Sequence, residues 1–443
     1  MANVLFTNVR IFDGTGTHPY LGEVLVQGNR IKRVSAGAGT LPTAGLDVVD
    51  GGGAMLMPGM TEAHTHFGWN NQPSVEAIAF MPPEEHTLFA AGAAKTYLDA
   101  GFTSCVGAAA AKPRLDVVIR NAINSGQIPG PRFLASSQEF SVLGGLGDTS
   151  PPHAEHPGLN TAYTVSGPDD VRRGVRWFIR LGVDLIKLSI SGEEVAGIGG
   201  QETLMSGEEV AMACLEAKRR GRRVTAHARS AESVKLCVRH GVDIIYHASY
   251  ADDEALDMLE ANKEKHFVAP SIAWLIKTAR DAAAYNIAPG SPVAIAYERE
   301  LEIACETMKK MKRRGIRILP GGDYGFAWIP HGTNAKDLEY FVDLFGFSPI
   351  EALLSTTKLG GEIMGRGDEL GQLKEGYLAD MVLVVGDPLA DIRVLQDHGR
   401  IVAIMKDGEF HKRPERASRA ALAPGAAPME AGMPGAGLIA RMG

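Results

Sequence analysis

The stretch that decides the fold runs Met57-Pro58-Gly59-Met60-Thr61-Glu62-Ala63-His64-Thr65-His66, where an apolar run ends in two histidines. Side chains alternate along a β-strand, so His64 and His66 point to the same face. Residues 48–57 before them predict a strand, a glycine turn and an apolar lead-in. Two imidazoles on one face of a strand end form half of a metal site, although a His-x-His pair alone is weak evidence.

Outward from this strand, residues 60–365 alternate between strand-like and helix-like segments. Strand–helix units repeated about every 20–30 residues imply parallel strands joined by right-handed crossovers. Their number favours a (β/α)8 TIM barrel over an open sheet. The clearest segments are strands at 183–189, 223–228, 242–247 and 317–320, and helices at 207–220, 231–240, 252–262 and 292–314.

The two ends of the chain show short strands without helices between them. Gly28-Asn29 and Asp407-Gly408 are typical of the tight turns that join such strands. We therefore predict an α/β protein whose barrel carries a small β-sandwich domain built from both termini. The expected parts are the sandwich at 1–58 and 366–412, the catalytic barrel at 59–365, and a low-complexity tail at 413–443.

The composition argues against several classes of function. Of the 443 residues, 45% are hydrophobic, which is enough to bury a large core. The net charge of −7 is mild, and no basic stripe or polybasic segment indicates a nucleic acid or a membrane partner. The four cysteines lie far apart, which is typical of reduced thiols. Because the sequence shows no signal peptide and no long apolar span, we expect a cytoplasmic protein.

Polar side chains follow several of the predicted barrel strands at the point where each strand ends. The carboxyl ends of barrel strands carry the chemistry in this architecture. Each residue alone has a structural explanation: a strand-end histidine is often only hydrogen-bonded, Lys187 could extend to solvent, and Asp323 could cap a helix. Taken together, the set indicates a metal site. Its members are His64, His66, Lys187, His227, His247 and Asp323.

These residues and their neighbours resemble the metal-dependent amidohydrolase superfamily, and within it the branch of prolidase-like and ochratoxin-hydrolysing amidohydrolases. The resemblance covers roughly residues 3–410. The segments that carry it are 57–66, 183–192, 224–228, 241–248, 319–323 and 371–382.

The resemblance implies a binuclear centre in a (β/α)8 barrel. One divalent ion would be held by His64, His66 and Asp323, and the other by His227 and His247. Lys187 would react with CO2 to give a carbamate that bridges both ions, because an ammonium group cannot bind a cation. Asp323 would also serve as the general base. Zinc is the expected metal, with manganese or cobalt possible; a small-molecule substrate and a homo-oligomer are expected as well.

The sequence departs from the prolidase-like pattern at two positions. Leu146 stands where many relatives have a histidine in Gly-His-Gly-Asp, and Arg229 stands where many have a tyrosine. Arg229 offers a fixed charge and several donors. We expect it either to contact a substrate carbonyl oxygen or carboxylate, or to pair with Glu193, Glu194 or Asp148. These departures argue against dipeptidase activity.

Three further residues could bind substrate. Trp69 and Trp328, in loops after the first and eighth strands, could line an aromatic pocket, and His331-Gly332 resembles a recurring element of the family. The sequence thus favours hydrolysis of an amide, urea or carbamate-type C–N bond. One alternative is a mononuclear deaminase or a cyclic amidine or imide hydrolase. Ser230 argues against it, because deaminases usually have a glutamate at this position. The other alternative is a non-catalytic homologue, which would typically lack metal ligands.

Overall fold

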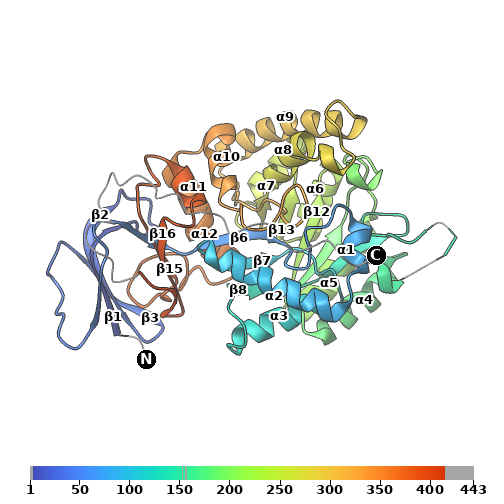
Figure 1. Cartoon of the computed structure of the whole chain (residues 1–443). Coiled ribbons are helices and arrows are strands. Elements are labelled where there is room, and N and C mark those ends of the chain that lie inside the picture. The colour runs from blue at the N-terminus through green and yellow to red at the C-terminus, as the bar shows by residue number, and fades with distance from the viewer. Residues whose placement is uncertain (1–2, 152, 155–156, 415–443) are drawn as a thin grey trace.

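The barrel predicted from the sequence is present in the computed structural model, which describes residues 3–151, 153–154 and 157–414 (Figure 1). Its strands pair in parallel in two sheets, ordered β6-β7-β8 and β10-β9-β11-β12-β13-β14. The strands are β6 (Met60–Thr65), β7 (Phe102–Gly107), β8 (Arg132–Leu134), β9 (Ser136–Val142), β10 (Ala162–Val165), β11 (Leu185–Ser189), β12 (Arg223–Ala228), β13 (Ile244–His247) and β14 (Phe267–Ala269).

The eighth strand position is occupied by residues 317–320, which form one isolated bridge instead of a full strand. Ile318 pairs in parallel with Val268 of β14. On the other side, the amide of Ala63 in β6 donates to the carbonyl of Pro320 over 3.1 Å. Pro320 has no amide hydrogen, and two glycines follow it, so the ladder stays short. These contacts join β14 to β6 and close the ring.

Helices follow most of the strands and cover the outside of the barrel (Figure 1). Several begin at a serine that caps the first turn; Ser206, for example, forms a reciprocal capping box with Glu209. No helix among the described residues is both long enough and apolar enough to cross a membrane. The helices are α1 (Val75–Phe80), α2 (Pro83–Asp99), α3 (Leu115–Asn124), α4 (Pro168–Leu181), α5 (Gly207–Arg219), α6 (Ala231–His240), α7 (Asp253–Ala261), α8 (Ile272–Asp281), α9 (Pro292–Arg313), α10 (Lys336–Phe345), α11 (Pro349–Thr356) and α12 (Lys358–Ile363).

The predicted β domain is an eight-stranded sheet made from both ends of the described chain. Strand β5 pairs in parallel with β1 and antiparallel with β15, so it joins the two ends. The predicted tight turns lie between β2 and β3 and between β16 and β17. Apart from Arg413 and Pro414, the predicted tail lies outside the described residues. The strands are β1 (Asn3–Ile11), β2 (Tyr20–Gln27), β3 (Arg30–Ala36), β4 (Asp47–Asp50), β5 (Met55–Pro58), β15 (Met381–Val384), β16 (Ile401–Lys406) and β17 (Glu409–Lys412).

Gly59 is the only residue between β5 of the β domain and β6 of the barrel. Its amide donates to the carbonyl of Asp380 over 3.0 Å. A Cβ atom at this position would lie 2.1 Å from the Thr103 hydroxyl oxygen, so a larger residue would push β7 away. Arg132 at the start of β8 also pairs with the buried Asp380 carboxylate at 3.1 Å. The β domain is therefore attached directly to the strand that carries the histidine pair.

Candidate metal centre

The six residues predicted as metal ligands come together at the carboxyl ends of the barrel strands. Five of them are at most 4% exposed, and the side chain of Asp323 is 13% exposed. Five of the six line one cavity of about 50 Å³, while His247 lies behind it. Their positions are His64 and His66 at the end of β6, Lys187 in β11, His227 in β12, His247 at the end of β13, and Asp323 after residues 317–320.

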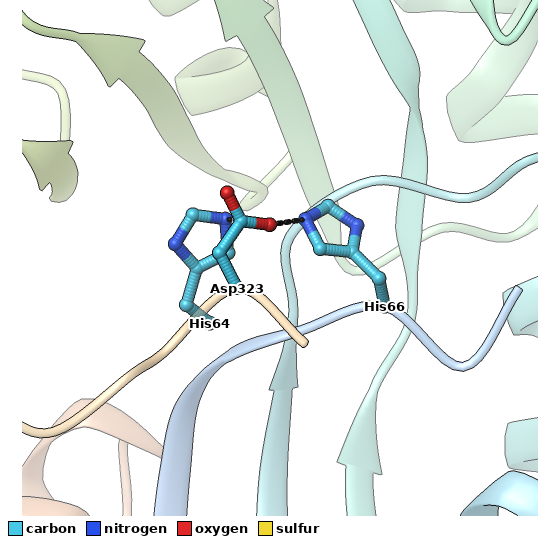
Figure 2. A group of neighbouring side chains, drawn as sticks. All are labelled: His64, His66 and Asp323. Carbon is cyan, nitrogen blue, oxygen red and sulfur yellow. Dashed lines mark ion pairs between the residues drawn. The ribbon is translucent and has the colours of Figure 1, made fainter. Parts of the chain in front are cut away.

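The first cluster consists of His64, His66 and Asp323 (Figure 2). The Nε2 atoms of His66 and His64 lie 3.0 Å and 3.5 Å from the same Asp323 carboxylate oxygen. The other ring nitrogen of each histidine is anchored: His64 Nδ1 lies 2.7 Å from the Ser271 hydroxyl, and His66 Nδ1 lies 3.1 Å from the carbonyl of Ala109. Such anchors orient both Nε2 atoms toward the carboxylate, as in protein metal sites.

The charges of this cluster suit a cation. Burial lowers the pKa of His64 well below its usual value, so its ring is neutral near pH 7. Burial raises the pKa of Asp323, but the neighbouring His64 and His66 outweigh it and hold the net pKa well below the usual range. Asp323 has φ +63° and Ser271 has φ +54°, conformations that cost energy in residues other than glycine. The fold therefore maintains strained backbone where it places these groups.

The second cluster consists of His227, His247 and Glu193, whose possible ligand atoms lie within 4.8 Å of one another. His227 Nε2 lies 2.9 Å from the carbonyl of Gly192, which leaves Nδ1 for a ligand. Neither ring nitrogen of the fully buried His247 has a hydrogen-bond partner among the described residues. Burial lowers the pKa of both histidines well below the usual value. Two buried neutral imidazoles with free nitrogens are what a second cation requires.

Lys187 lines the cavity together with residues of both clusters. Its side chain is nearly fully buried, and Nζ lies 4.6 Å from the centre of the Tyr246 ring. Burial lowers the pKa of Lys187, although Glu139 and Asp323 oppose this. The Glu139 carboxylate on the adjacent β9 accepts a hydrogen bond from Ser189 over 2.6 Å. Among the described residues Lys187 forms no ion pair, which is unusual for a buried lysine.

Arg229 is fully buried and is held by two carboxylates, so its contacts favour the ion-paired alternative over the substrate contact. Its guanidinium pairs with Glu193, through Nε at 2.9 Å and through Nη2, and its Nη1 pairs with Glu300 of α9. Tyr297 also donates to Glu193. Burial alone would lower the pKa of Arg229, but Glu193 and Glu300 raise it, so the charge is permanent. Arg229 lines neither the inner cavity nor the one outside it.

The two predicted pocket tryptophans lie in adjoining chambers. Trp69 stacks on His66 with ring centres 4.2 Å apart and lines the inner cavity. Trp328 lines an outer cavity of about 350 Å³ and donates to Thr278 over 2.9 Å. Val75, Val195 and Phe326 line both cavities, which therefore adjoin. Together they form a path from the surface to the two clusters.

His331 lines neither chamber, which corrects the expected substrate contact. Its Nε2 lies 2.7 Å from the carbonyl of Trp69, and its Nδ1 lies 3.2 Å from the Tyr97 hydroxyl. Burial lowers the pKa of His331 to about 4. The residue supports the loop that holds Trp69 against His66.

Several residues of the centre were not singled out as site residues from the sequence. Ser271 gave no local signal, because its partner His64 lies 207 positions away in the sequence. Glu139 did not stand out from its strand, because β9 is buried but consists largely of polar residues. Glu300 stands three positions after Tyr297, and this spacing places both on one face of a helix.

The fold and the two clusters define a barrel enzyme with two candidate metal sites. A sequence model of the Amidohydrolase family matches residues 55–410, so the chain belongs to this family of enzymes, which act on carbon–nitrogen bonds.

Three relatives show the range of the family near this chain. Ochratoxinase from Aspergillus niger is 26% identical over 379 residues, which cover 81% of this chain and 76% of that protein. The crystal structure of a Xaa-Pro dipeptidase with bound methionine has a TM-score of 0.83 at 27% identity and covers 93% of this chain and 100% of its own. A prolidase complexed with N-methylphosphonate-L-proline gives a TM-score of 0.83 at 26% identity, with 93% and 99% covered.

Proposed function

We propose that the chain hydrolyses an amide, urea or carbamate-type C–N bond of a small molecule with a pair of divalent metal ions, of which zinc is the first candidate. The observation that supports this most directly is the convergence of two clusters of histidines and carboxylates at one cavity. His64, His66 and Asp323 would hold one ion, and His227 and His247 the other. A carbamate on Lys187, formed with CO2, would bridge them.

The residues fit such ions in three respects. The free nitrogens of His247 are unpaired buried groups, which are costly unless a ligand binds them. The anchors on His64 and His66 leave one nitrogen of each ring for a cation. The lowered pKa of Lys187 favours the neutral amine, which is the form that reacts with CO2.

In the reaction, bound divalent ions would polarise the scissile carbonyl and make hydroxide available near neutral pH. Asp323 would accept the proton of the attacking water and deliver it to the leaving nitrogen. Its carboxylate is suited to this role because its second oxygen is not used by the contact to His64 and His66. Trp69 and Phe326 would surround the bound substrate and exclude bulk water.

The test is the metal content per chain of the wild type and of Lys187→Ala, both purified in buffer with bicarbonate. We expect about two ions in the wild type and a sharp fall in the variant, with turnover of a member of an amide, urea and carbamate panel lost in parallel. Lys277→Ala, a partly exposed lysine of α8 paired with Asp281, is the matched control and should keep both ions.

Equal metal content near one ion in both proteins would contradict the proposal. It would instead favour the mononuclear deaminase or cyclic amidine hydrolase, for which Lys187 has no role. Ser230, which replaces the glutamate of deaminases, accepts from the Ser233 amide at the start of α6 and lies 2.7 Å from the Thr203 hydroxyl. These contacts use Ser230 as a helix cap.

A further inference from the structure

The outer chamber, which must accept the part of the substrate beyond the scissile bond, has apolar side chains along one part of its wall. Val195, Phe326 and Trp328 contribute to it, together with Tyr285 and Ile287. A cavity of about 350 Å³ with such walls has the size and character of a small-molecule site. The bound group should therefore be aromatic or otherwise apolar.

The charged side chains that line the outer chamber are acidic. Glu76 and Asp148 are the only charged residues among those described that line it. The inner cavity differs, because it contains Lys187 and would hold the proposed divalent ions. Asp148 is kept ionised by the amides of Gly144 and Ser150, at 3.0 Å and 3.2 Å. No fixed positive charge is placed where the substrate's outer part must lie.

The nearby cationic groups are already committed. The guanidinium of Arg229 is fully buried between Glu193 and Glu300, and moving it to a substrate would leave two buried carboxylates unpaired. Lys187 faces the clusters at the bottom of the inner cavity. Leu146, which lines the inner cavity, is apolar. A carboxylate in the outer chamber would thus lose water without gaining a partner.

We infer that the substrate is an aromatic-sized amide-type compound that carries no carboxylate on the part that lies in the outer chamber. This inference rests on the proposed function and narrows it. Neutral compounds, and compounds with a positive charge near Glu76 and Asp148, satisfy the charge pattern of the outer chamber.

The test uses two compounds that differ only in one group, placed across an aromatic ring from the amide: N-benzyl-4-carboxybenzamide and N-benzyl-4-(hydroxymethyl)benzamide. With zinc-loaded enzyme in bicarbonate buffer, kcat/KM and the dissociation constant are measured for both. We expect at least about a tenfold preference for the alcohol, since an unpaired ionised group costs more than about 1.4 kcal/mol. The preference should lie mainly in KM, because the carboxylate does not take part in the chemical step.

Glu76→Lys locates the effect in the outer chamber. Replacing one negative by one positive charge at this exposed site should reduce the preference for the alcohol by about threefold, and added salt should diminish this change. The matched control is Glu84→Lys, also an exposed glutamate in the first turn of a helix, which lines neither chamber. The Glu84→Lys enzyme should prefer the alcohol over the acid to the same extent as the wild type.

Each outcome has a definite meaning. Equal or better kcat/KM for the acid, or tighter binding of the acid, would overturn the inference while leaving the proposed function intact. Tighter binding of the alcohol without cleavage of any C–N compound would sustain the inference and count against the proposed function. Binding of neither compound would overturn the inference, because the outer chamber would then reject aromatic amides.

Discussion

The two halves of the candidate centre are built in different ways. The first half, His64, His66 and Asp323, is oriented by hydrogen bonds to a hydroxyl and a backbone carbonyl. The second half, His227 and His247, lies beside a buried ion-pair network around Arg229. Neutral anchors are inexpensive to bury, whereas the charged network is stable only if every member is present. The first half should therefore tolerate loss of an anchor, and the second half should not.

The largest expected effect is a loss of catalysis when the first half of the centre is changed. Asp323→Asn would remove the proposed proton acceptor and weaken a proposed metal ligand, and we expect kcat to fall by about 10⁴-fold. Steady-state kinetics with metal analysis would measure both losses. Asp281→Asn on α8 is the control. A kcat within tenfold of the wild type would show that another group accepts the proton.

The second-largest expected effect is a loss of stability when the surroundings of the second half of the centre are changed. Arg229→Met leaves Glu193 and Glu300 buried without a counter-charge, so the free energy of unfolding should fall by about 3–5 kcal/mol. Urea denaturation of the metal-free protein would measure this. Combining the change with Glu193→Gln and Glu300→Gln should restore much of the loss, since the carboxylates would no longer be charged. A loss below about 1 kcal/mol would place the network among weak ion pairs.

The free energy of unfolding should depend on pH through His331, which supports the first half of the centre by its contact with the Trp69 carbonyl. Its pKa of about 4 lies below the ordinary value of 6.5, so the folded state favours the neutral ring. Its contribution is complete above pH 6.5 and is lost as the pH falls from 6.5 toward 4. Compared with His331→Gln, the wild type should lose about 2 kcal/mol more of its free energy of unfolding between pH 7 and pH 5. Identical pH profiles would show that His331 is not held neutral.

The smallest effect concerns the neutral anchors themselves. Ser271→Ala removes the partner of His64 Nδ1, and we expect about tenfold weaker zinc binding in a chelator competition. Ser249→Ala is the matched control, because the Ser249 hydroxyl is also buried but has no hydrogen-bond partner among the described residues. A similar affinity in the two variants would mean that packing alone orients His64.

The first half of the centre could be predicted because its signals are local. Two histidines at a spacing of two residues, after an apolar run, fix both the strand and the face. The strands at 223–228 and 242–247 and the helix at 231–240 followed from short apolar runs and a glycine at the helix end. Lys187 and Asp323 were found because they follow the same rule of strand ends.

The charged surroundings of the second half could not be predicted because they depend on how helices lie over the barrel. Glu300 meets Arg229 only because α9 packs against α8 and the loop after β11. The sequence offered Glu193, Glu194 and Asp148 as partners with nothing to choose between them. The eighth strand was predicted at the right place, but its pairing at a single residue depends on the ring closing around it.

The attachment of β5 to β6 through Gly59 has a consequence for how the protein is made. Strand β5, which precedes the histidine pair, pairs with β15 (Met381–Val384). The pairing of β5 is therefore complete only after the ribosome has synthesised β15. The strands that carry Lys187, His227 and His247 are neighbours in the sequence and can associate much earlier. During synthesis the histidine pair, which appears first in the chain, would thus be among the last parts of the centre to settle.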